Sequence, residues 1–156
     1  MSNKTVKEQI LDDIKDALSG IKRVNGFDNT IEVVERWDQR GNDRAVIPCL
    51  FIHTGNEQKE NRPSFVTGCT LTVNLDLWTV HDKARYPGST DQLLNSFAND
   101  IENAVLKDMQ RNGLAERTTV MSIDLFETVE GQPYCGVIVT LEINYKHKFG
   151  DPKTQI

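Results

Sequence analysis

Hydrophobic and polar residues alternate along residues 71–78 of the chain, LTVNLDLW. One set of alternate positions is entirely apolar: Leu71, Val73, Leu75 and Leu77. The other set is polar until it reaches a tryptophan: Thr72, Asn74, Asp76 and Trp78. Because successive side chains of a β-strand point to opposite faces, this pattern predicts a strand with one buried and one free face. The strand is predicted over residues 65–80, with a β-bulge at Gly68 near its start.

Two other segments have the period of an amphipathic helix. In the first, an apolar residue recurs at every fourth position: Val6, Ile10, Ile14 and Leu18. In the second, the same spacing is widened by three more apolar residues: Leu93, Phe97, Ile101 and Val105, with Leu94, Ala104 and Met109. Thr5 with Glu8, and Ser89 with Gln92, have the spacing of a capping box, which marks a helix start. The predicted stops are Gly20 and Asn112-Gly113.

Four further segments have the composition of strands: 30–37, 46–54, 120–129 and 137–146. The first two are joined by the polar connection DQRGNDRA, which predicts a hairpin, and the last two by EGQPYCG, a second predicted hairpin loop. In 120–129 the alternating apolar residues are Met121, Ile123 and Leu125. The charged stretch GNEQKENRP, residues 55–63, is predicted to be a loop before the long strand.

These elements predict an α+β fold: a two-layer sandwich, with a mostly antiparallel sheet of about four to five strands and two helices packed on one face. Residues 1–150 are predicted to form a single α+β domain, followed by a short polar C-terminal tail at 151–156. With both helices on one side, no predicted element remains to cover the other side of the sheet. That uncovered face is the first candidate for an interaction surface.

The composition narrows the classes of function. The chain has 156 residues and a net charge of -5, which argues against broad electrostatic binding to nucleic acid. No apolar run is long enough for a membrane span, and the start MSNKTVKEQI has no apolar core of a secretory signal. The three cysteines, Cys49, Cys69 and Cys135, are predicted to be buried, reduced thiols of a cytoplasmic protein.

The known catalytic and nucleotide-binding motifs are absent from the sequence: it contains no GxGxxG, GxxxxGK[ST], CxxC, HExxH or GxSxG. The remaining enzymatic hypothesis is a small metal-dependent hydrolase in which Asp76 and Glu142, on the polar sides of their strands, hold a metal ion. The alternative is a solvated sheet face with cross-strand charge pairs. We favour the alternative, and predict no catalytic, cofactor-binding or metal-binding residue.

Trp78 is the most distinctive residue of the free face. The alternation of their strands places Val80 and Ile138 on the same free face, so the three side chains are predicted to form one apolar patch for contact with another protein chain. The competing interpretation is a tryptophan that is covered by the loops of its own chain.

In order along the chain, several segments resemble the tail terminator proteins of long-tailed bacteriophages. They are the helix VKEQILDDIKDAL, the strand IPCLFIHTGNE, the strand CTLTVNLDLW, the helix TDQLLNSFANDIENAVLKD and the terminal pair SIDLFETVEGQPYCGVIVTLEINYKHKFGDP. Tyr145, near the end of the last strand, adds to the resemblance. Together the segments span nearly the whole chain.

The resemblance implies a structural virion protein with no enzymatic activity. Such a protein forms a ring, typically a hexamer, that caps the tail tube, stops its polymerisation and offers a docking surface to the head–tail connector. The genome passes through the lumen without specific binding. The protein would be assembled in the host cytoplasm and located at the head-proximal end of the tail, with no membrane partner.

Within this hypothesis, the predicted loop with Lys59, Glu60 and Arg62 projects towards a partner or the lumen, or is a solvated hairpin end. Another neck or tail component, a head–tail adaptor or a minor tail protein, is the alternative with the same architecture.

Overall fold

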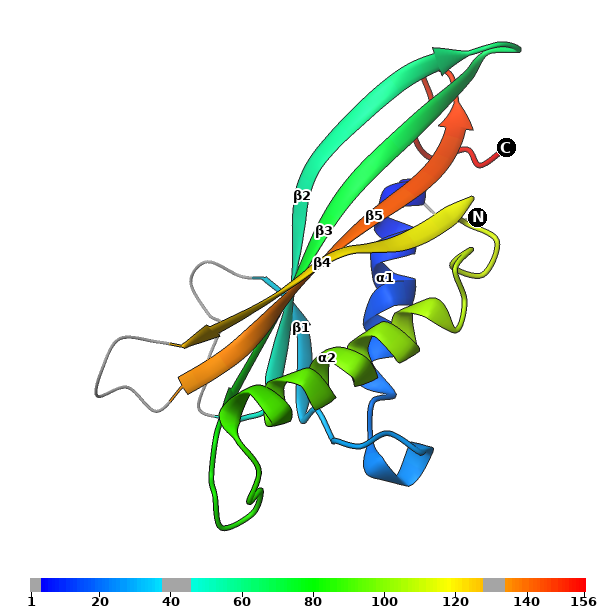
Figure 1. The fold of residues 1–156 in the computed structure, drawn as a ribbon. Coiled ribbons are helices and arrows are strands. Elements are labelled where there is room, and N and C mark those ends of the chain that lie inside the picture. Colours follow the sequence, from blue (N-terminus) through cyan, green and yellow to red (C-terminus); the bar gives the residue numbers. More distant parts are fainter. Residues whose placement is uncertain (1–3, 38–45, 128–133) are drawn as a thin grey trace.

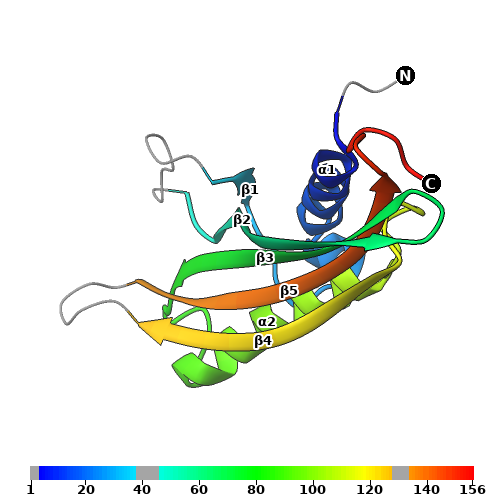
Figure 2. The same ribbon diagram turned by 90° about the horizontal axis from the view of Figure 1, so that it is seen from above.

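The computed structural model describes residues 4–37, 46–127 and 134–156. Its elements, in chain order, are α1 Val6–Ser19, a 3-10 turn η1 Arg23–Asn25, β1 Val33–Arg36, β2 Cys49–Arg62, β3 Val66–Val80, α2 Thr90–Leu106, β4 Arg117–Glu127 and β5 Tyr134–Lys148. The strands form one five-stranded sheet in the order β1-β2-β3-β5-β4. Both helices lie on the same side of this sheet (Figures 1 and 2). The predicted two-layer α+β sandwich is therefore confirmed.

The predicted hairpin between residues 30–37 and 46–54 is wrong. β1 pairs with β2 in the parallel direction, with Val33 opposite Cys49, and every other strand pair is antiparallel. All of the connection DQRGNDRA, and the first four residues of the predicted loop EGQPYCG, lie outside the described residues. The polar composition of a connection carries no information on the direction in which the two strands that it joins pair with each other.

The alternation of β3 decides which side of the sheet is buried. Leu71, Val73, Leu75 and Leu77 are fully buried beneath the helices, as predicted. The same parity continues in β5, where every second residue joins the core: Val137, Val139, Leu141, Ile143 and Tyr145. The four apolar residues predicted for the first helix are also fully buried. Cys49, Cys69 and Cys135 are buried free thiols, so their predicted burial is confirmed.

The helix starts follow the predicted capping residues. The Ser89 hydroxyl accepts a hydrogen bond from the Gln92 N–H, and the Gln92 side chain accepts one from the Ser89 N–H, which completes a capping box. Thr5 accepts from the Glu8 N–H at 3.1 Å. The Glu8 carboxylate instead contacts Arg36 of β1, at 2.8 Å. Of the two hydrogen bonds in the first predicted capping box, the one to the Thr5 hydroxyl is therefore the one that forms.

α2 ends earlier than predicted, at Leu106, because Arg111 closes the helix. Its buried guanidinium donates to the carbonyl oxygen of Val105, in the last turn of α2, where carbonyls lack an intrahelical partner, and to that of Asp108, just beyond the helix. Its Nη1 lies 3.4 Å from the Asp13 carboxylate of α1. Met109 falls beyond this end and is 52% exposed, so its predicted place in the apolar stripe is wrong.

Residues 55–63 were predicted to be a loop, and this prediction is wrong for all but the last of them. β2 continues to Arg62 and pairs with β3 along that whole length, with Glu60 opposite Gly68. The bulge lies in β2 between Thr54 and Glu57, not at Gly68. The result is a long β2–β3 hairpin that projects beyond the helices (Figure 1).

Partly buried polar contacts hold the base of this hairpin. The Tyr145 hydroxyl donates to the Glu57 carboxylate at 2.5 Å, and Lys7 of α1 lies 3.4 Å from the same carboxylate. Burial and the Glu57 contact raise the pKa of the Tyr145 phenol, which keeps it a neutral donor. Lys59 donates to His147 Nε2 at 3.1 Å, because the other ring nitrogen faces the Lys148 carbonyl. These contacts explain how so polar a sequence remains in the sheet.

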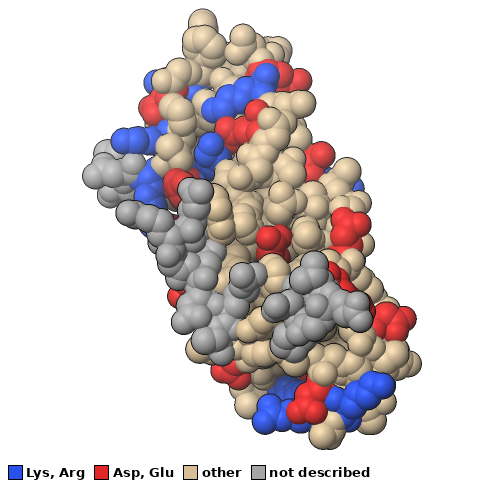
Figure 3. Space-filling model, turned by 90° about the vertical axis from the view of Figure 1, so that its left-hand side faces the viewer, with Lys and Arg blue, Asp and Glu red and all other residues tan. Residues whose placement is uncertain are grey.

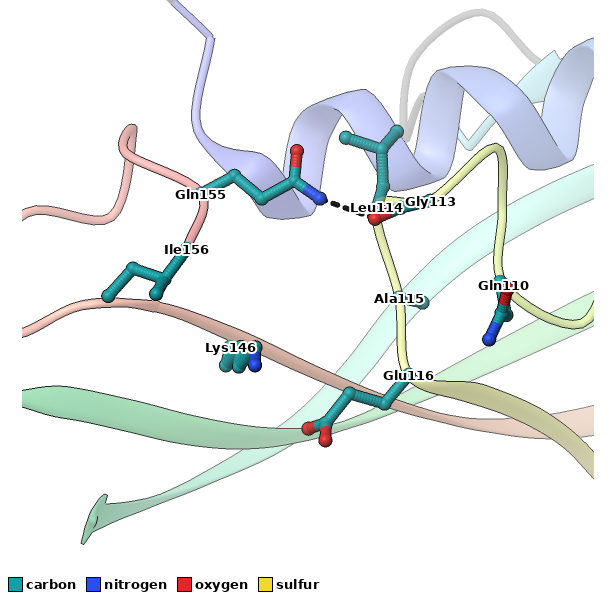
Figure 4. A pocket seen from close by; sticks show the side chains of 8 residues that line it. All are labelled: Gln110, Gly113, Leu114, Ala115, Glu116, Lys146, Gln155 and Ile156. Atoms are coloured by element: carbon teal, nitrogen blue, oxygen red, sulfur yellow. Dashed lines mark hydrogen bonds between the residues drawn. The ribbon is translucent and has the colours of Figure 1, made fainter. Parts of the chain in front are cut away.

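The C-terminal tail folds back on the domain. The Val6 N–H donates to the Pro152 carbonyl at 2.9 Å, which ties the tail to the start of α1. The side chain of Gln155 donates to the Gly113 carbonyl, and the tail borders a small pocket of about 210 Å³ (Figure 4). Lys146 and Glu116 face this pocket from the sheet side. The predicted polar tail is thus packed against the 110–116 turn.

Candidate assembly surface

The open face of the sheet lies opposite the helices. The strand register places Trp78, Val80 and Ile138 on this face in successive rows: Trp78 opposite Gly136, Val80 opposite Tyr134, and Ile138 opposite Asp76. The predicted shared face is therefore observed. All three side chains are only partly buried. Charged side chains gather at the two ends of this face, and separate acidic side chains lie between them among uncharged ones (Figure 3).

Trp78 belongs to an aromatic cluster on this face. Its ring lies edge-on to Phe126 of β4, with 4.8 Å between centroids, and to Tyr134 of β5, at 6.3 Å. Gly136 makes this packing possible: a Cβ there would lie 2.4 Å from the Phe126 ring and 1.9 Å from the Leu77 carbonyl oxygen. Such edge-to-face aromatic pairs stabilise a rigid surface. Phe126 and Gly136 were missed by sequence reasoning, because their place depends on cross-strand register.

The side chains of His53 and Asp76 meet beside this cluster, with 2.9 Å between Nε2 and the carboxylate. Trp37 stacks on the His53 ring at 5.1 Å. Burial raises the pKa of the Asp76 carboxyl, and His53 opposes that shift. The antiparallel pairing of β2 with β3 brings His53 to Asp76, and a correct register prediction could have found this pair.

The geometry does not support a shared metal site of Asp76 and Glu142. Glu142 pairs with Thr72, which lies four residues from Asp76 along β3. At about 3.3 Å per residue the two carboxylates are roughly 13 Å apart, whereas ligands of one hard cation all lie within about 2.6 Å of it. Among the described residues, no three His, Cys, Asp or Glu side chains are grouped as metal ligands would be.

β4 forms an edge of the sheet, since β5 alone among the described strands pairs with it. The apolar residues predicted to alternate there are exposed: Met121 56%, Ile123 39% and Leu125 41%. Ile123 and Leu125 lie opposite the buried Val139 and Val137, so they are on the helix side of the sheet. We call these three residues and their unpaired backbone the β4 edge. A long edge strand with exposed apolar side chains is typical of a surface that another chain covers.

The charged residues predicted for a projecting loop lie on the strand β2 instead. Lys59 is held by His147, and Arg62 contacts Glu60 at 3.2 Å and Glu116 at 2.9 Å. The Arg62 guanidinium lies over Gly68, where a Cβ would be only 2.3 Å from its Nε. These side chains brace the hairpin, and the exposed end of the structure is the turn that follows them.

No protein-family model matches the chain, and no curated protein matches it. Among the described residues, no helix has the length and apolar character needed to cross a membrane.

Proposed function

We propose that this protein is a structural subunit of a phage-type long tail, a tail terminator whose copies form a ring on the end of the tail tube. The observation that carries the proposal is the β4 edge next to the open sheet face. Together they offer an apolar edge and an aromatic face that a second chain could bury. The likeness of the successive segments to tail terminator proteins supports the same function.

In this proposal the ring, a hexamer, docks on the last tube ring and prevents addition of further tube subunits. Its other side provides the docking surface for the head–tail connector. The protein would be part of the virion, at the head-proximal end of the tail, and would act without enzymatic chemistry. A closed ring requires two different contact patches on each subunit, because neighbours meet head to tail.

The proposal is tested by the length of tail tubes grown in vitro from the tube protein of the phage that encodes this chain. We expect the wild-type chain to stop elongation at a molar ratio of about one ring per tube end. Leu125→Lys should weaken this arrest, since it places a charge on the β4 edge. Met109→Lys is the matched control, because Met109 is similarly exposed outside that edge. Tubes that elongate equally with and without the wild-type chain would contradict the proposal.

A further inference from the structure

An open cleft of about 870 Å³ lies at the end of the sheet where β2 begins and β3 ends, beside the first turns of α2 (Figure 1). Six apolar or aromatic side chains line it: Ile47, Pro48, Val80, Tyr86, Leu93 and Phe97. Its lining shares no described residue with the β4 edge. A concave site with apolar walls and a few placed polar groups is the usual form of a ligand pocket. The polar groups of this cleft therefore indicate which ligand fits it.

Asn29 is the polar group whose orientation is best defined. It is 6% exposed, and its side-chain nitrogen donates to the Ser96 hydroxyl and to the Asp100 carboxylate, both at 3.0 Å. Its Oδ1 oxygen has no donor among the described residues, yet the one buried side-chain nitrogen or oxygen without a partner in that part of the chain is Arg111 Nη1. Asn29 Oδ1 is therefore open to solvent, and the residue lines the cleft. Thr79 also lines it, is 5% exposed, and has a hydroxyl without a partner in the described structure.

The charged residues around the cleft balance one another. Two are carboxylates, Glu32 and Asp82, and two are arginines, Arg23 and Arg85. The Asp82 carboxylate lies 3.8 Å from Arg85. The Arg23 guanidinium donates to the Asp28 carbonyl at 3.2 Å. Equal numbers of the two signs give no net field that would favour an anion or a cation, so we expect a ligand without net charge.

A secondary amide matches the two uncharged polar groups, since it carries one N–H donor and one carbonyl acceptor. We propose that the cleft binds a neutral ligand that joins an apolar group to a secondary amide. The amide N–H donates to Asn29 Oδ1, and the amide carbonyl accepts from the Thr79 hydroxyl. The apolar group packs against Pro48, Leu93 and Phe97. A peptide segment with apolar side chains and a free small amide share this chemistry. The inference goes beyond the proposed ring and does not depend on it.

The first test titrates N-benzylacetamide into the isotope-labelled wild-type chain and follows the backbone amide signals by NMR. This probe carries one aromatic ring and one secondary amide, so its dissociation constant should be about 1–10 mM. The signals of Asn29, Thr79 and Phe97 should move. N-benzyl-N-methylacetamide is the matched control, because its amide has no N–H, and it should bind at least about threefold more weakly. The comparison changes the ligand and leaves the protein intact.

Two variants test whether the probe occupies the cleft. Ile47→Lys brings a charged chain into the lining and should weaken binding at least about tenfold. Val46→Lys is the matched control, because Val46 is 52% exposed and lies outside the lining, and it should bind like wild type. The spectrum of each variant without probe shows whether it is folded.

A neutral capped tripeptide of leucine, alanine and leucine distinguishes the two sources of the ligand. Binding at least about tenfold tighter than that of N-benzylacetamide would assign the cleft to a peptide segment, and equal or weaker binding would assign it to a small amide. Cleft signals that stay unmoved at about 20 mM probe would overturn the inference. Equal binding of the two benzyl amides, or unchanged binding to Ile47→Lys, would overturn it as well.

Discussion

Replacement of the buried carboxylate of Asp100 should destabilise the fold strongly. Asp100 of α2 is 2% exposed and accepts three hydrogen bonds from the segment before β1. They come from the Asp28 N–H at 3.1 Å, the Asn29 N–H at 2.9 Å and the Asn29 side-chain amide at 3.0 Å. Asn29 also lines the open cleft with Pro48 and Phe97, so this carboxylate anchors one wall of that cleft.

The magnitude follows from the donors that Asp100→Ala would leave without an acceptor. The two bonds from Asn29 are buried, and hydrogen bonds to a charged group contribute about 1.5–3 kcal/mol each. The free energy of unfolding should therefore fall by roughly 3–6 kcal/mol. Asp100→Asn retains one acceptor oxygen and should lose about half of that.

Urea unfolding followed by circular dichroism measures this loss. Asn99→Ala is the matched control, because Asn99 is exposed on the same helix and its replacement changes helix propensity by a similar amount. The control should change the free energy of unfolding by less than about 0.7 kcal/mol. A loss below about 1 kcal/mol for Asp100→Ala, with an unchanged dependence on urea, would refute the assigned role of the carboxylate.

Two further predictions concern the open face. Gly136→Ala should lower the free energy of unfolding by at least about 2 kcal/mol in urea titrations, because the added Cβ would meet the Leu77 carbonyl and the Phe126 ring. Gly20→Ala is the control: the nearest atom to its added Cβ is at 3.4 Å, so the free energy of unfolding should change little. In the folded protein the pKa of the Asp76 carboxyl lies above its ordinary value of 3.8. The carboxyl therefore contributes fully to stability below pH 3.8, and this contribution is lost as the pH rises through the pKa of the folded state. The stability of wild type relative to Asp76→Asn should therefore fall with pH over that window in urea titrations from pH 3 to 7; a difference that is flat or rises would contradict the direction of the shift.

The helices and the central strands could be predicted because their signal is local. The four-residue stripe of α1 and the two-residue alternation of β3 each bury one face against the other layer. Capping residues marked both helix starts, at Thr5 and Ser89. Such patterns depend only on neighbours in sequence, which a single chain displays fully.

The outer half of β2 could not be predicted from its own residues. The stretch GNEQKENR is polar and resembles a loop, yet it forms strand because Glu57 and Lys59 find partners on α1 and β5. Those partners lie far away in the sequence. The parallel direction of β1 has the same cause, since pairing direction depends on the path of the intervening chain.

The candidate surfaces were predicted in part. The two-residue alternation along each strand was sufficient to place Trp78 and Ile138 on the uncovered face. The exposure of the β4 edge was missed, because a regular alternation of apolar residues shows which face they share but not whether anything covers them. The exposure of Phe65 was also missed, although Pro63-Ser64 before it is a turn signal.

Self-assembly into a closed ring is the central claim, and imaging with a mass measurement tests it most directly. The purified wild-type chain would be examined at high concentration by negative-stain electron microscopy and by mass photometry, alone and with tail tubes. The account predicts six-fold rings of one defined mass, and rings seated on tube ends. A chain that remains a monomer at every concentration and leaves the tube ends bare would contradict it.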